Sequence, residues 1–155
     1  MRIKKIKVTS DKKVNIAYEK ISKTGMWDEY TFTCSELPRP ELLTSLSQIA
    51  PHVIEMCELP DSYVDKIDVR SVSFSYGGEK EVMGATITSQ MKLDKSNCNL
   101  NLNTPHKASD SYSDAPADEK QLLTDICIDD LGRLCDEVKL YIGGERAQGK
   151  LFAVS

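Results

Sequence analysis

The chain has 155 residues, enough for one domain with a sizeable core, and its formal net charge is −4. Hydrophobic residues make up 40% and charged residues 28%, and no apolar run approaches the ~20 residues that span a bilayer. The basic start, Met1–Val8, alternates apolar with charged side chains, which predicts a strand and not a signal peptide. We therefore expect a cytoplasmic protein with no membrane partner.

The charge is distributed unevenly. Residues 1–35 carry eight Lys and Arg against four Asp and Glu, whereas residues 36–155 carry twelve against twenty. The basic segment is too short and too weakly charged to predict direct binding of nucleic acid. Its lysines are better explained as protection of exposed strands against edge-to-edge aggregation.

The first part of the chain predicts three strands followed by a helix. Alternating apolar residues in 3–8 and 14–18, joined by a short polar turn, indicate a hairpin, and residues 30–34 continue the alternation. Helical spacing of apolar residues follows over 42–57. Pro40 suits the first turn of this helix, and Pro51 should kink it or split it in two.

The second part repeats this order. Strands are expected at 69–76 and 82–91 around the turn Gly77-Gly78-Glu79-Lys80, and residues 98–102 alternate so clearly that they predict a half-buried third strand. The segment 107–117 has the composition of a mobile surface loop. A second helix should begin near Pro116, with Leu122 and Leu123 in its apolar stripe, and end at Gly143-Gly144.

The two parts can be aligned. Residues 6–10 match 72–76, residues 14–18 match 82–86 less closely, and 30–34 match 98–102. The predicted fold is α+β, an antiparallel sheet of about six strands with two helices, made of tandem strand–strand–strand–helix units in a pseudo-two-fold relation. We expect one domain over 1–144, with units of about 1–60 and 61–144, and a flexible C-terminal tail over 145–155.

The sequence holds no catalytic signature and no pattern that calls for a metal or cofactor. Neither His52 nor His106 has a partner at metal-ligand spacing, and the five cysteines form no Cys-x-x-Cys pair. The acidic polar face of the second helix could meet a basic partner, but a solvated face explains it more simply. The protein is therefore not expected to be an enzyme.

The tail exposes two large apolar residues, Leu151 and Phe152. They either pack back onto the core or serve as an anchor for a partner. Gln148-x-x-Leu151-Phe152 resembles the pentapeptide by which bacterial replication and repair proteins dock onto the DNA polymerase sliding clamp. Leu-Phe fills an apolar pocket and the glutamine hydrogen-bonds at its rim, although Gly149 stands here where leucine is usual.

A second resemblance is carried by four segments, Val69–Gly78, Met83–Thr88, Asn103–Lys107 and Gly144–Phe152. Through these segments most of the chain resembles a family of uncharacterised phage and prophage proteins of Gram-positive bacteria. The resemblance brings no known activity. It implies a phage setting inside a host cell, among genes of DNA metabolism or host takeover.

Two functional hypotheses follow from these observations. The first is a non-enzymatic phage accessory protein that binds a host partner, the sliding clamp, through Gln148, Leu151 and Phe152. The second is a counter-defence protein, which either inhibits a defence protein or sequesters a nucleotide signal. For such a nucleotide the expected contacts are Arg70, Tyr76, His106 and Lys107.

Overall fold

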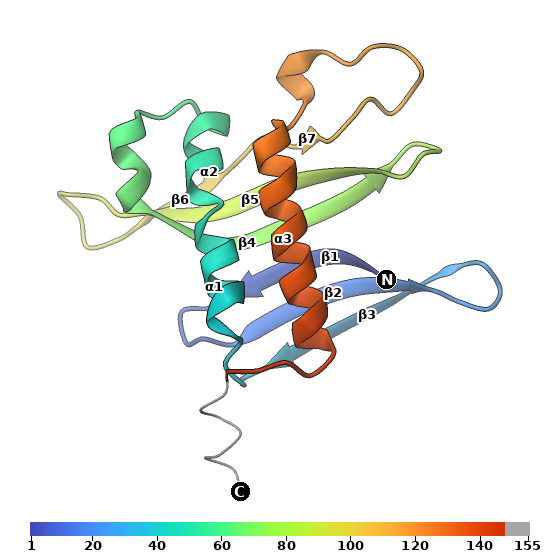
Figure 1. Cartoon of the computed structure of the whole chain (residues 1–155). Coiled ribbons are helices and arrows are strands. Elements are labelled where there is room, and N and C mark those ends of the chain that lie inside the picture. The colour runs from blue at the N-terminus through green and yellow to red at the C-terminus, as the bar shows by residue number, and fades with distance from the viewer. Residues whose placement is uncertain (148–155) are drawn as a thin grey trace, which may run out of the picture.

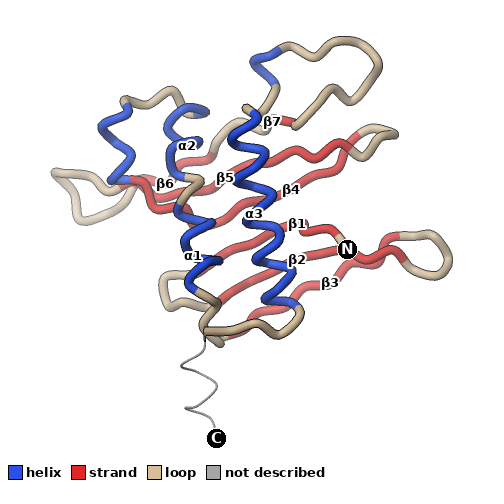
Figure 2. Tube along the Cα trace, in the orientation of Figure 1, coloured by secondary structure: helices blue, strands red, loops and turns tan. Residues whose placement is uncertain are grey.

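The computed structural model describes residues 1–147 and shows two layers, a seven-stranded antiparallel sheet and three α-helices that all lie on one of its faces (Figures 1 and 2). The α+β class and the antiparallel sheet are thereby confirmed. The strands follow the order β3-β2-β1-β4-β5-β6, with β7 beside β5. Their bounds are β1 Arg2–Val8, β2 Val14–Ile21, β3 Trp27–Cys34, β4 Ile67–Gly77, β5 Val82–Met91, β6 Leu100–Asn103 and β7 Lys107–Ala108.

The two halves of the sheet have the same strand order when each is followed from the centre to the edge, as the predicted duplication requires. β1 and β4 pair antiparallel at the middle, with Ile6 opposite Val72, and each then continues into its own three-strand meander. The same irregularity also occurs in both units. One extra residue interrupts the register between Ile3 and Lys5 in β1, and another does so between Val69 and Ser71 in β4. A two-fold rotation that superimposes Ile6 on Val72 also superimposes the two extra residues.

The outer strands, however, match in a different register from the predicted one. Val14 pairs with Val8, and Ala85 pairs with Phe74. The structural counterpart of Val14 is therefore Ala85. The sequence alignment had matched Val14 with Val82, which lies three positions earlier. The reason is the longer second hairpin, whose pairing continues beyond this point to Gly77 and Val82.

The first helical segment is divided as predicted. α1 spans Pro40–Ser47 and α2 spans Ala50–Met56, with Pro40 and Pro51 each in a first turn, where a missing N–H costs nothing. A short 3₁₀ helix, Asp61–Lys66, leads into β4.

The predicted start of the last helix was wrong. α3 spans Asp125–Ile142, and the Thr124 hydroxyl caps it by accepting a hydrogen bond from the N–H of Cys127. Leu122 and Leu123 precede the helix in extended backbone, where Leu123 N–H donates to Ala108 O at 2.8 Å. Pairing with β7 therefore competes successfully with helix extension for these two residues.

The last strand of the second unit is less buried than its alternation suggested. Leu100 is 44% exposed and Cys98 is also exposed, so the prediction of a half-buried strand over 98–102 was wrong. β6 is a four-residue edge strand, and within residues 1–147 it pairs only with β5. Alternation shows which residues share a face but not whether anything covers that face.

The core lies between the sheet and the helices. Its completely buried members come from both units and from every layer: Ile6, Val14, Ile49, Val53, Val72, Ala85, Ile87, Leu131, Leu134 and Val138. Burial of these side chains is the main force that holds the helices on the sheet.

Replacing Leu131 of α3 with alanine should lower the free energy of unfolding by about 2–5 kcal/mol, because its side chain is 0% exposed and a cavity would remain. Urea unfolding measures this loss. The matched control is Ile126→Ala on the same helix, where the side chain is 70% exposed and the change should stay within about 0.5 kcal/mol. Equal effects of the two variants would contradict the described packing of α3.

Candidate functional site

The residues of the proposed docking motif, Gln148, Leu151 and Phe152, lie outside the described part of the chain. What the structure does describe is the point from which this segment departs. Ala147 N–H donates to Leu37 O at 3.0 Å, and Glu145 N–H donates to Leu140 O at 3.0 Å. Residues 145–147, which the sequence assigns to the tail, are therefore bonded to the body of the domain.

Arg146 holds this departure point in place. Its guanidinium lies 3.6 Å from the centre of the Tyr141 ring, and its Nη1 donates to Tyr141 O at 2.6 Å, at the end of α3. Its Nε lies 3.6 Å from a carboxylate oxygen of Glu36, just after β3. A cation over an aromatic face and a charge-assisted bond to a helix-end carbonyl are both favourable. Arg146 therefore links the end of α3 to the segment that follows β3.

Tyr141 completes this link from the inside. The tyrosine is 1% exposed, its hydroxyl donates to Glu36 O at 2.7 Å, and its ring stacks on Phe32 of β3 with centroids 6.4 Å apart. Burial is the main reason why the pKa of Tyr141 lies well above its usual range. The motif thus begins seven residues after the buried Tyr141 and directly after Ala147, whose N–H is bonded to Leu37.

The four residues of the nucleotide hypothesis are engaged separately. Arg70 pairs with Asp68 at 2.7 Å, and the Tyr76 hydroxyl donates to Ile3 O at 2.7 Å while burial raises the pKa of that phenol to about 12. His106 contacts Ser75, and Lys107 borders a pocket beside α2 and α3. His106 lines one cavity and Lys107 lines another, so the two side chains do not form one site.

A cavity of about 290 Å³ adjoins His106, at the lower end of the sizes typical of ligand sites. His106 Nε2 lies 2.7 Å from Ser75 Oγ, and its ring lies so close to Gly84 that a Cβ there would come within 2.5 Å of it. Asp110 and Asp118 are the charged side chains of the lining. Two carboxylates at the wall disfavour the phosphates of a nucleotide.

The loop that borders this cavity is packed against the second hairpin. The Tyr112 ring lies against Gly77, where an added Cβ would be 3.0 Å from it, and Tyr112 O would be 2.8 Å from a Cβ on Gly78. Lys80 pairs with Asp114 at 3.2 Å. The expected hairpin turn is present but begins at Gly78, because Gly77 still pairs with Val82. The absence of side chains at both glycines leaves room for this loop.

His52 has a partner that the sequence did not reveal. It is 6% exposed on α2, and its Nε2 lies 2.7 Å from Asp130 Oδ2 of α3, whose side chain is 14% exposed. Arg133 donates to the other oxygen of Asp130 at 2.9 Å. Asp130 follows Cys127 by three residues and stands next to Leu131, and this spacing already indicated that it lies on the buried side of the helix. Nothing in the sequence indicated that its partner would be His52.

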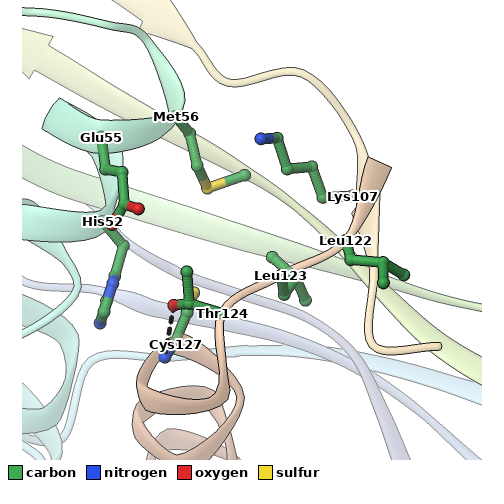
Figure 3. Close-up of a pocket in the computed structure, with 8 residues that line it drawn as sticks. All are labelled: His52, Glu55, Met56, Lys107, Leu122, Leu123, Thr124 and Cys127. Atoms are coloured by element: carbon green, nitrogen blue, oxygen red, sulfur yellow. Dashed lines mark hydrogen bonds between the residues drawn. The ribbon is translucent and has the colours of Figure 1, made fainter. Parts of the chain in front are cut away.

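A small pocket lies next to this pair, between α2, β7 and the start of α3 (Figure 3). Its volume of about 30 Å³ leaves room for about one water molecule. Cys127 borders the pocket, yet burial, together with the smaller effect of nearby Asp130, raises the pKa of its thiol to about 12. A thiol that stays protonated is a poor nucleophile, so the pocket does not have the properties of a catalytic cysteine site.

Within residues 1–147 no group of three or more His, Cys, Asp and Glu side chains is arranged to hold a metal ion. Over the same range, no helix is both long and apolar enough to cross a bilayer. Comparisons with models of known families, with curated proteins and with solved structures found no match.

Removing the carboxylate of Asp130 should destabilise the protein by about 1–3 kcal/mol, because His52 would be left buried without its hydrogen-bond partner. Urea unfolding of Asp130→Ala measures the loss. Asp129→Ala is the control, since its side chain is exposed on the same helix and should change stability by less than about 0.5 kcal/mol. A neutral Asp130→Ala variant would mean that the pair contributes nothing to stability.

The described cysteines should differ strongly in reactivity. At pH 8 the exposed Cys98 should react with iodoacetamide first, whereas Cys127 should stay unlabelled because its pKa of about 12 keeps it in the thiol form. Peptide mass spectrometry measures the labelling, and labelling in urea provides the fully reactive reference. Rapid modification of Cys127 in the folded protein would instead indicate an activated thiol.

Proposed function

We propose that this protein is a non-catalytic accessory protein of a phage, which docks onto the DNA polymerase sliding clamp of its bacterial host through Gln148, Leu151 and Phe152. The observation that carries the proposal is the Gln-x-x-Leu-Phe pattern itself. A peptide of this kind needs an apolar pair for a pocket on the partner and a glutamine for its rim. By occupying the clamp, the protein would either bring phage factors to it or compete with host ones.

The geometry next to the motif supports a docking role. Arg146 and Ala147 are bonded to the body of the domain, and the motif starts directly after them. A recognition peptide that begins at a fixed point loses less freedom on binding than one at the end of a long linker.

The nucleotide-sequestering alternative has less support. Arg70, Tyr76 and His106 are held by separate partners, and the cavity of about 290 Å³ near His106 is bordered by carboxylates. Inhibition of a defence protein through the acidic face of α3 rests on charge alone. Neither form of the counter-defence hypothesis is favoured by a specific contact.

Titration of the purified clamp of a Gram-positive bacterium with the protein, followed by calorimetry, tests the proposal. Leu151→Ala and Phe152→Ala should each weaken binding about thirtyfold or more, since anchors of this kind contribute about 2 kcal/mol or more. Gln148→Ala should weaken it less. Lys150→Ala is the matched control, because it changes a variable position of the motif and should leave affinity unchanged.

Truncation after Ala147 gives the complementary test. It removes the whole motif but keeps the contacts of Arg146 and Ala147, so the domain should remain folded. Full affinity of the truncated protein for the clamp would overturn the docking mechanism. Absence of binding by the intact protein would overturn the choice of partner.

A further inference from the structure

The outer edge of β3 has features that distinguish it from most sheet edges. β3 pairs with β2 over eight consecutive residue pairs without a bulge, and its sequence contains no lysine and no proline. Proteins commonly use these devices to prevent pairing at an exposed edge. At the opposite end of the sheet β6 is only four residues long (Figure 1).

The hydrogen-bonding groups that face outward from β3 can be identified from its hairpin. Ser22 N–H donates to Met26 O at 2.7 Å, and hydrogen-bonded pairs recur at every second position of an antiparallel ladder. Residues 28, 30, 32 and 34 therefore bond toward β2. Glu29, Thr31 and Thr33 turn their N–H and C=O groups outward, where no strand lies in the described structure.

We propose that β3 pairs antiparallel with β3 of a second copy of this chain, about a two-fold axis at Thr31, and joins two sheets into one. This register places Thr31 opposite itself and Glu29 opposite Thr33 of the second copy. The outward groups of both strands then meet as hydrogen-bonded pairs. The proposal does not depend on binding to the clamp.

The side chains on the helix-covered face suit this register. Tyr30 comes opposite Phe32 of the second copy, in the closer, non-hydrogen-bonded type of pair. Tyr30 is 44% exposed and already stacks on Tyr18 at 5.2 Å, while Phe32 stacks on Tyr141. The pairing would extend this aromatic row across the axis and bury an exposed ring.

The charges also favour a second copy. Asp28 comes opposite Cys34 of the other chain, and neither Asp28 nor Glu29 faces its own counterpart. Arg146 Nη2 lies 3.9 Å from Cys34 Sγ, so the carboxylate of Asp28 would arrive beside the guanidinium of the other copy. Within the described residues Asp28 forms no ion pair, and the contact would give it one at each end of the interface.

Sedimentation equilibrium of the full chain tests the proposal. The wild type should have twice the mass of the 17.3 kDa chain, and Thr31→Pro should return it to the monomer mass. Proline at 31 removes an N–H that points away from β2, so the β2–β3 ladder stays intact and circular dichroism should be unchanged. The matched control is Asn101→Pro on β6, which should remain dimeric.

The outward direction at Asn101 follows from the same argument. Thr104 N–H donates to Ile87 O, so residues 100 and 102 of β6 bond toward β5 and Asn101 faces outward. A monomeric wild type, or a Thr31→Pro variant that stays dimeric, would overturn the proposal. Dimerisation only after truncation at Ala147 would also overturn it, because the last eight residues of the same chain would then compete for the edge.

A cross-linking experiment tests the register and remains valid if Thr31→Pro fails to fold. In a background with Cys34 and Cys98 replaced by serine, Thr31→Cys should form an intermolecular disulfide under mild oxidation. Its two Cα atoms would be about 5.5 Å apart, within disulfide range. Thr33→Cys, whose two copies lie on either side of the axis, should not cross-link. Equal cross-linking of both variants would contradict this register.

Discussion

The antiparallel pairing of β1 with β4 is the contact on which the rest of the structure depends. Ile6 and Val72 face each other there, both are completely buried, and they form the middle one of the three residue pairs that join the two meanders. Each meander alone is a small sheet with one apolar face, which cannot exclude water unaided. Joined at the centre, the two form a surface wide enough for α1, α2 and α3 to cover together.

The repeated bulge shows how closely the two units follow one plan. Lys4 and Arg70 occupy the extra position in β1 and β4, each between two residues that keep their register with the outer neighbour. A bulge increases the local twist of a strand, so two equivalent bulges twist both halves in the same sense around the axis. The two units differ outside the paired strands that they share. The differences are the longer second hairpin, the loop that carries Tyr112, and the anchored segment around Arg146.

Much of the fold could be predicted because its signals are local. Alternation identified β1 to β6 but not β7, whose residues were expected to lie in a loop. Pro40 and Pro51 divided the first helical segment, and the match of residues 6–10 with 72–76 placed Ile6 on Val72. The start of α3 could not be predicted, because it depends on whether Leu122 and Leu123 pair with β7. The exposure of β6 likewise depends on which part of the sheet the helices cover.

The contacts around the candidate sites could not be predicted from the sequence for a related reason. Tyr141 and Glu36 are 105 positions apart, and His52 and Asp130 are 78 apart. No periodicity within one element indicates such partners, since they depend on how α2, α3 and β3 are packed. The proposed docking motif differs in this respect, because it is a contiguous pentapeptide and can be proposed from the sequence without any structure.

The edge of β3 and the start of the motif segment are physically connected. Cys34, at the end of β3, contacts Arg146, and Leu37 holds Ala147. In the two-fold arrangement each Cys34 would lie three residues from the axis, so the two Cys34 residues would be about 20 Å apart at strand spacing. If the proposed motif docks, two copies joined in this way could engage two sites on one partner, which raises overall affinity without any new contact. The edge would then control how strongly the docking segment binds, although it contributes nothing to the motif itself.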